Sequence, residues 1–266
     1  MWPAIINVMD SAARKAARSL LHDFGEVEQL QVSRKGPADF VSEADRRAEQ
    51  IIKAELSKAR PGFSMLLEEE GAVGSQDAAD RWIVDPLDGT TNFLHGIPHF
   101  AISIAHEQNG ELVAGMVYDP TRDETFWAVK GAGCFLGNSR LRVSARDNLD
   151  IAVLATGIPF GNRPGKEEMR AALVPVMDRT AGLRRFGAAS LDLAYVAAGR
   201  FDAFWEIGLA PWDVAAGIVL IREAGGLVSE LDGRADPLNG GTILAANSRL
   251  YDPVAKMLRD AIRGKR

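Results

Sequence analysis

The segment from Trp82 to Leu94 limits the fold and the function more than any other stretch of the chain. Its first three residues are aromatic or β-branched and predict a buried strand. Pro86 and Gly89 predict a sharp loop directly afterwards, because proline fixes its own φ and glycine tolerates a left-handed backbone. Asp85 and Asp88 should therefore project from one tight loop at the end of a strand, which is where ligands bind in open α/β sheets.

This loop offers oxygen ligands of the kind that Mg²⁺ prefers. Asp85, Asp88 and the backbone carbonyl of Leu87 are all hard oxygen donors. Thr90 and Thr91 add hydroxyl groups, and if Thr90 begins a helical turn, its amide faces outward to an anion. A surface turn built on Asp-Pro and Asp-Gly is the alternative interpretation. The length of the whole string favours a binding site over that turn.

Composition places the chain among ordinary globular proteins. It has 266 residues, 47% of them hydrophobic and 25% charged, which is enough for one large domain or two small ones. The net charge of −5 argues against a nucleic-acid-binding surface. Cys134 is the only cysteine, so an intrachain disulfide and a cysteine zinc site are excluded. No apolar run is long enough to span a membrane, and we expect a cytoplasmic protein.

Apolar spacing predicts alternating helices and strands along the first half of the chain. Asn109-Gly110 is a hairpin signal and predicts that the strands around it form an antiparallel meander. The glycine-rich run 131–137 is interpreted as a turn, and residues 72–80 as a mobile acidic loop. The predicted helices are 3–24 and 43–59, and the predicted strands are 63–67, 82–84, 100–106, 112–118, 125–129 and 141–143.

The second half alternates more regularly, and its predicted elements run up to Gly226. Its last helix follows Pro211, and Asp213 is a plausible N-cap for it. The small residues Ala215, Ala216 and Gly217 should let this helix pack closely against its neighbours. The predicted strands are 151–156, 183–187 and 201–206, and the predicted helices are 166–180, 188–198 and a final one that ends at Gly225-Gly226.

Two further acidic positions are candidates for chemistry. Glu68 and Glu69 follow an apolar strand, and their run ends on Gly71, which favours a functional role over a solvated surface. Asp45 falls at the third position of a predicted helix that Ser42 can cap. A capping role therefore stands beside a catalytic role for Asp45.

The segment 82–94 closely resembles the signature of the inositol monophosphatase family, the lithium-sensitive Mg²⁺-dependent phosphatases. The segment from Pro211 to Gly226 resembles the second signature of that family, and the two occur in the family's order. Glu68-Glu69 is similar to its Gly-Glu-Glu element. The resemblance covers nearly all of the chain, and residues 184–208 look most like the bacterial inositol-1-monophosphatase branch.

The resemblance implies a layered α/β fold, the αβαβα sandwich of the inositol monophosphatase and fructose-1,6-bisphosphatase type. It implies one phosphatase domain over residues 1–266, with subdomains of about 1–147 and about 148–266, and a homodimer. The implied activity is Mg²⁺-dependent hydrolysis of inositol monophosphate to myo-inositol and phosphate by metal-activated water, without a covalent intermediate. Li⁺ is the implied inhibitor.

The resemblance also implies the metal ligands. Of two or three Mg²⁺ ions, one would bind Glu68, Asp85 and the Leu87 carbonyl. A second would bind Asp85, Asp88 and Asp213.

Catalytic and substrate-binding roles follow from the same resemblance. Thr90, hydrogen-bonded to Asp45, would orient the attacking water with help from Glu68, and Glu206 would bind substrate hydroxyls. The family often has a hydroxyl where this chain has Ala188. The residues implied to contact substrate are Asp88, Gly89, Thr90, Thr91, Gly187, Ala189, Glu206 and Asp213.

Other substrates fit the same chemistry. Fructose 1,6-bisphosphate, 3′-phosphoadenosine compounds and histidinol phosphate are alternatives within the enzyme class. A regulatory protein that keeps the fold and acts through a protein partner is the alternative from another class.

Overall fold

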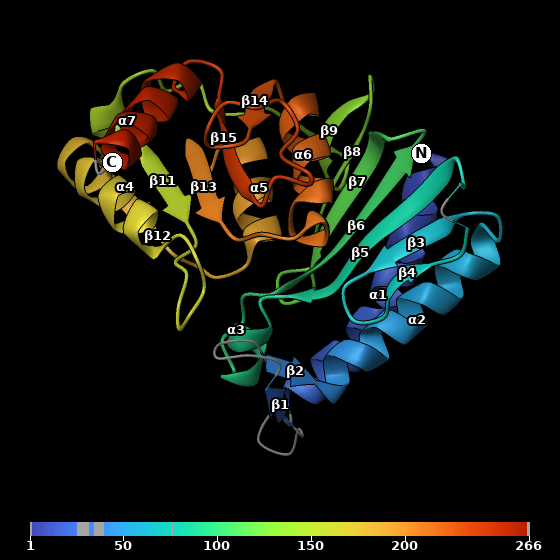
Figure 1. Cartoon of the computed structure of the whole chain (residues 1–266). Coiled ribbons are helices and arrows are strands. Elements are labelled where there is room, and N and C mark those ends of the chain that lie inside the picture. Colours follow the sequence, from blue (N-terminus) through green and yellow to red (C-terminus); the bar gives the residue numbers. More distant parts are fainter. Residues whose placement is uncertain (1, 26–31, 35–39, 76, 265–266) are drawn as a thin grey trace.

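Five layers of helices and sheets make up the part of the protein that the computed structural model describes, residues 2–25, 32–34, 40–75 and 77–264. The layers follow one another as helices, sheet, helices, sheet and helices (Figure 1). This arrangement confirms the αβαβα sandwich expected from the sequence. Within the described residues, no helix combines the length and the apolar character that crossing a bilayer would require.

The larger sheet has eight strands in the order β10-β9-β8-β7-β6-β5-β3-β4. Only β3 and β5 pair in parallel, and β6, β7 and β8 form the predicted meander. Asn109 and Gly110 both have positive φ, 51° and 78°, as the predicted hairpin turn requires. The strands are β3 (Ser64–Leu67), β4 (Gly71–Val73), β5 (Asp80–Asp88), β6 (Ala101–Gln108), β7 (Glu111–Asp119), β8 (Glu124–Val129), β9 (Gly133–Leu136) and β10 (Ser139–Leu141).

Several predicted boundaries in this sheet were wrong. The loop predicted over 72–80 begins as β4, and the turn predicted over 131–137 contains β9. The strand predicted over 141–143 ends at Leu141. The short strands β4 and β9 form because β3 and β8 supply their hydrogen-bond partners, which apolar spacing does not reveal.

The central strand β5 does not stop at Val84, as the sequence suggested, but continues to Asp88. Its register with β6 shifts between Asp85 and Asp88. The shift accommodates Pro86, which has no N–H to donate to the neighbouring strand. The irregular end of β5 thus stays within the sheet while its carboxylates are turned out of the regular pattern.

Two helices cover one face of the eight-stranded sheet, α1 (Ala4–Phe24) and α2 (Glu43–Ala59). Apolar side chains of α1 such as Ile6 and Met9 are fully buried there together with Trp82. The short strands β1 (Val32–Arg34) and β2 (Phe40–Ser42) pair antiparallel beside the first residues of α2.

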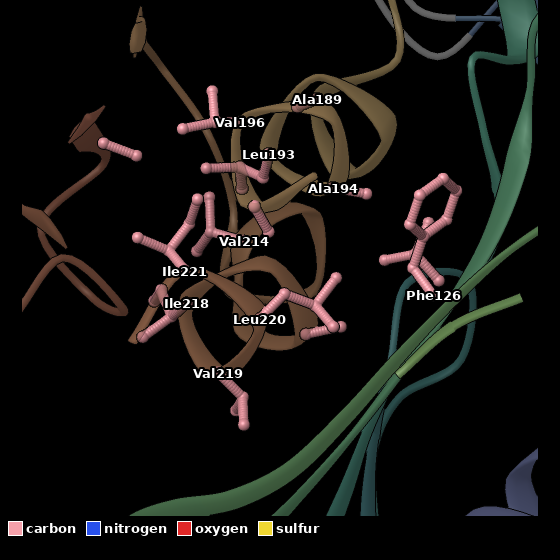
Figure 2. Packing of buried hydrophobic residues seen from close by; sticks show 14 of the residues in the cluster. Phe126, Ala189, Leu193, Ala194, Val196, Val214, Ile218, Val219, Leu220 and Ile221 are labelled. Atoms are coloured by element: carbon pink, nitrogen blue, oxygen red, sulfur yellow. The ribbon is translucent and has the colours of Figure 1, made fainter. Parts of the chain in front are cut away.

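The middle layer consists of α5 (Ala189–Ala197) and α6 (Pro211–Glu223), which lie between the two sheets (Figure 2). A Cβ atom on Gly115 of β7 would lie 2.7 Å from the Ala216 carbonyl oxygen. A Cβ atom on Gly217 would lie 2.4 Å from Leu193 Cδ1 on α5. The expected close packing of α6 through small residues is therefore confirmed on both of its sides.

The smaller sheet has five strands in the order β12-β11-β13-β15-β14, and α4 and α7 cover its outer face. Its strands lie within residues 153–247, whereas those of the larger sheet lie within 64–141. The division into subdomains near residue 147 stays a prediction. The elements are η2 (Leu149–Ile151), β11 (Val153–Thr156), α4 (Lys166–Arg179), β12 (Gly182–Arg184), β13 (Ala203–Ile207), β14 (Gly226–Ser229), β15 (Thr242–Asn247) and α7 (Tyr251–Arg263), of which the last three lie beyond the last element predicted from the sequence.

Candidate active site

The loop at the end of β5 is held by its own side chains. Asp85 Oδ1 accepts a hydrogen bond from the Leu87 amide at 2.9 Å. Gly89 has a φ of 94°, and a Cβ atom there would lie 3.0 Å from the His99 carbonyl oxygen, so a larger residue would be strained and crowded. The helix α3 (Thr90–Leu94) begins immediately afterwards, so Thr90 meets the condition under which its amide would face an anion.

Thr90 connects this loop to the outer helix α2. Its Oγ1 lies 3.0 Å from the Leu87 carbonyl oxygen and 3.4 Å from Asp45 Oδ2. Asp45 is the third residue of α2 and is only 1% exposed. Thr91, the next residue, is exposed on α3. The structure thus brings Thr90 and Asp45 together and leaves Thr91 at the surface.

A group of three carboxylates lies beside Thr90. Oxygen atoms of Asp45, Glu68 and Glu69 all lie within 4.8 Å of one another, a spacing that one cation can span. Glu49 supports this group, because its carboxylate accepts the Glu69 and Glu70 amides at 2.8 and 3.0 Å. Sequence reasoning missed Glu49, although its position four residues after Asp45 places both on one face of α2.

Asp88 extends from β5 to the beginning of α5. Its Oδ2 accepts the Ser190 amide at 2.7 Å and the Ser190 hydroxyl at 2.5 Å, and its Oδ1 accepts the Ala189 amide at 3.3 Å. Gly187, with a φ of 84°, leads into this helix. A carboxylate is favoured at a helix N-terminus, where amide groups point outward. Sequence reasoning missed Ser190, which lies 102 residues from its partner.

Asp213 is not the N-cap of α6, as the sequence suggested. The helix begins at Pro211, because proline needs no N–H at the first helical position, and Ala210 is the N-cap. Asp213 is the third residue, and its Oδ2 accepts the Ala210 amide at 2.7 Å. Ser103 Oγ donates to the Trp212 carbonyl oxygen at 3.3 Å and ties the start of this helix to β6.

The carboxylates from these separate elements repel one another. Burial raises the pKa of Asp85 well above its ordinary value, and Glu68, Asp88, Asp213 and Asp45 raise it further. The pKa of Asp88 rises to about 6, chiefly through burial, although its donors on α5 lower it. Burial, and then the charge on Asp88, also raise the pKa of Asp213. Cations bound among these groups would remove that repulsion.

Glu206 lies on β13, close enough to Asp88 for the two charges to interact. Burial is the main reason that its pKa rises to about 8, and the charge on Asp88 adds to the effect while Arg185 and Arg163 oppose it. A Cβ atom on Gly157 would lie 1.9 Å from the Glu206 carboxyl group. Gly157 therefore leaves the space that the Glu206 side chain occupies, a role that sequence reasoning missed.

Comparisons with known proteins agree with this geometry. The chain belongs to the inositol monophosphatase family, whose model matches residues 3–263, and it is a phosphatase. The family is generally metal-dependent. Together with the fold, this membership confirms the resemblance drawn from the sequence signatures.

Individual relatives match the chain over nearly its full length. An inositol-1-monophosphatase from Mesorhizobium japonicum is 55% identical over 96% of this chain and 96% of its own. The Nus factor SuhB of Pseudomonas aeruginosa is 48% identical, with 93% of each chain covered. The crystal structure of the extragenic suppressor protein SuhB from Bartonella henselae has a TM-score of 0.93 at 53% identity, covering 97% of this chain and 99% of that one.

The raised pKa of Glu206 predicts a pH-dependent stability difference between the parent and Glu206→Gln. An acid whose pKa rises on folding binds its proton more tightly in the folded state, so stability falls as pH rises from about 4.5 to about 8. Glutamine stays neutral throughout. In EDTA, the melting temperature of Glu206→Gln should exceed that of the parent increasingly across this range and level off above it. A difference that stays constant with pH would contradict the buried, protonated state of Glu206.

Proposed function

We propose that this phosphatase hydrolyses inositol monophosphate to myo-inositol and phosphate with Mg²⁺ bound among the carboxylates at the end of β5. The observation that carries the proposal is the contact of Thr90 with Asp45 beside carboxylates that raise the pKa of one another. That arrangement combines a hydroxyl able to orient water with a group of negative charges that bound cations would balance. Family membership supports the same chemistry.

The available ligand atoms suit Mg²⁺. They are carboxylate and carbonyl oxygens, the hard donors that this ion selects. We propose that Glu68, Asp85 and the Leu87 carbonyl bind one ion and that Asp85, Asp88 and Asp213 bind a second. The total number of ions is two or three. The Leu87 carbonyl accepts from Thr90 and retains a second lone pair for a cation.

When bound, Mg²⁺ would supply an activated water and charge stabilisation for the leaving oxygen. Thr90, which lies between Asp45 and the Leu87 carbonyl, would orient the attacking water with help from Glu68. The outward amides of Gly89 and Thr90 would bind the phosphate. Every central aspartate has a role as a ligand, so none remains to act as a nucleophile, and water attacks phosphorus directly without a phosphoenzyme.

Glu206 suits a substrate rich in hydroxyl groups. Burial and then the charge on Asp88 raise the pKa of Glu206 to about 8 in the metal-free protein, and its carboxyl oxygens can accept from substrate hydroxyls in either protonation state. We propose that Glu206, together with the backbone at Gly187 and Ala189, binds the inositol ring. Fructose 1,6-bisphosphate, 3′-phosphoadenosine compounds and histidinol phosphate remain the alternative substrates.

Activity should depend on Mg²⁺ and be inhibited by Li⁺. The purified protein should hydrolyse inositol 1-phosphate in Mg²⁺ and lose at least about a hundredfold in rate in excess EDTA, because water activation and leaving-group stabilisation both need the ions. Release of inorganic phosphate across a panel of phosphomonoesters measures this directly. Full turnover in EDTA would contradict the proposal, and a preferred substrate other than inositol phosphate would correct it.

Two variants test whether Glu206 binds the polyol and not the phosphate. Glu206→Gln should raise KM for inositol 1-phosphate by about tenfold and change turnover of a simple aryl phosphate by less than about twofold. Gly157→Ala should give the same selective loss, because its methyl group must displace the Glu206 carboxyl group. Glu230→Gln, which changes a buried glutamate that follows β14 and is paired with Arg234, is the control. Equal losses on both substrates would contradict the assignment.

We also propose that the protein is a cytoplasmic homodimer. Phe160 and Phe186 are 53% and 39% exposed, and Arg185 lies 5.1 Å above the Phe160 ring, so aromatic surface is available for a second copy. Sedimentation as a monomer at micromolar concentration would contradict the dimer.

Relatives named Nus factor SuhB favour one second candidate, a regulatory role through a protein partner. This role would be separate from phosphate hydrolysis. The test is to express active and phosphatase-inactive variants in a strain from which the gene for this protein is deleted. If only the active variants restore function, the regulatory role is contradicted.

A further inference from the structure

Asp88 makes contacts that distinguish its two carboxylate oxygens. Oδ2 accepts two short hydrogen bonds from Ser190, one from the amide at 2.7 Å and one from the hydroxyl at 2.5 Å. Oδ1 accepts the Ala189 amide at the longer distance of 3.3 Å, and the Leu191 amide is a further donor to this carboxylate. Since each carboxylate oxygen has two lone-pair positions, the two short bonds from Ser190 occupy Oδ2, and Oδ1, with its longer bond, is the oxygen more available to a cation.

We propose that Ser190 is a positioning residue that makes Asp88 bind Mg²⁺ through Oδ1 alone. The inference rests on the proposed function, in which Asp88 is a metal ligand. The Ser190 hydroxyl is the side-chain donor among these contacts, and it fixes the rotation of the carboxylate about its Cβ–Cγ bond. Hydrogen-bonded partners of metal-binding carboxylates orient their ligands in this way.

The surroundings of Ser190 leave the hydroxyl little choice of partner. Ser190 is 0% exposed, so water does not compete for its hydroxyl; Leu191 and Leu193 nearby in the helix are buried and apolar, and Asp192 is a buried carboxylate. An unpaired hydroxyl in such a place costs free energy, so the bond to Asp88 is strongly favoured over rotation away from it. The side chain therefore holds the carboxylate in one orientation before any cation binds.

The contact also joins the two halves of the chain. Asp88 ends β5 of the larger sheet, whereas Ser190 lies at the start of α5 in the middle layer. Asn92 makes a second link nearby, because its Nδ2 donates to the Phe186 carbonyl oxygen at 2.8 Å. The orientation of Asp88 is thus set by a helix that lies about 100 residues further along the chain than the loop.

A purely structural role for Ser190 makes a different prediction from a positioning role. If the hydroxyl only caps α5, its removal should lower the stability of the metal-free protein and leave the affinity for Mg²⁺ unchanged. If it orients Asp88, its removal should weaken Mg²⁺ binding, because a carboxylate that is held only by backbone amides is less well ordered before the cation arrives.

The test compares Ser190→Ala with Ser190→Thr, which retains the hydroxyl. In Ser190→Ala, the Mg²⁺ concentration that gives half-maximal phosphatase rate should rise by about tenfold, and the Mg²⁺-dependent increase in melting temperature should shrink. Ser190→Thr should restore both towards the parent values. Ser229→Ala, which removes another buried hydroxyl far from the site, should leave both unchanged.

An unchanged or lower half-maximal Mg²⁺ concentration in Ser190→Ala would overturn the inference, as would a Ser190→Thr variant that is equally impaired. If Ser190→Ala does not fold, Ser190→Cys replaces it with the same expected direction, since a thiol is a weaker donor. If the parent itself needs no Mg²⁺, the proposed function fails, and the failure is thereby distinguished from failure of the positioning role alone.

Discussion

Repulsion between carboxylates at the end of β5 is the constraint around which this fold is arranged. Asp85 and Asp88 are nearly inaccessible to solvent. The charge on Asp213 raises the pKa of Asp85, and the charge on Asp88 raises the pKa of Asp213. Helix N-termini offset part of this cost. Asp88 accepts amides of α5, and Asp213 accepts the Ala210 amide at the start of α6, contacts worth up to about 2 kcal/mol in buried geometries.

The close packing of the middle layer keeps those helix ends in place. Gly115 lets α6 approach β7 until its backbone nearly touches the strand, and Gly217 lets it approach Leu193 on α5. Because interiors of this density transmit small displacements, a shift of α6 would move Asp213 relative to the loop. Packing between the sheets and the geometry of the site are therefore linked through the same helix.

Part of this site could be predicted from the sequence because its residues are close together along the chain. The spacing from Asp85 to Thr90 is short, and proline and glycine limit its backbone conformations, so a loop of oxygen ligands followed by a helical turn was foreseeable. Glu206 and the segment after Pro211 were found through family resemblance and not through local physics. The fold class followed from the same resemblance, with the alternation of apolar segments in support.

Contacts between distant segments could not be predicted in this way. Ser190 and Gly157 each take their role from a residue about 50 to 100 positions away, which no local pattern encodes. The short strands β4 and β9 likewise depend on pairing partners. The N-cap of α6 was predicted at Asp213, three residues after its actual position at Ala210. The reason is local, because Pro211 itself begins the helix.

The most direct test of the account is Asp85→Asn, measured by melting with and without Mg²⁺ and by one rate measurement. Asparagine keeps an oxygen that can accept the Leu87 amide and removes one charge from the repelling group. Without metal, the variant should be at least as stable as the parent. With Mg²⁺, the parent should gain stability, the variant should gain much less, and its phosphatase rate should fall by orders of magnitude. An Asp85→Asn protein with the parent's rate and the parent's Mg²⁺-dependent shift in melting temperature would contradict the metal site on which the account depends.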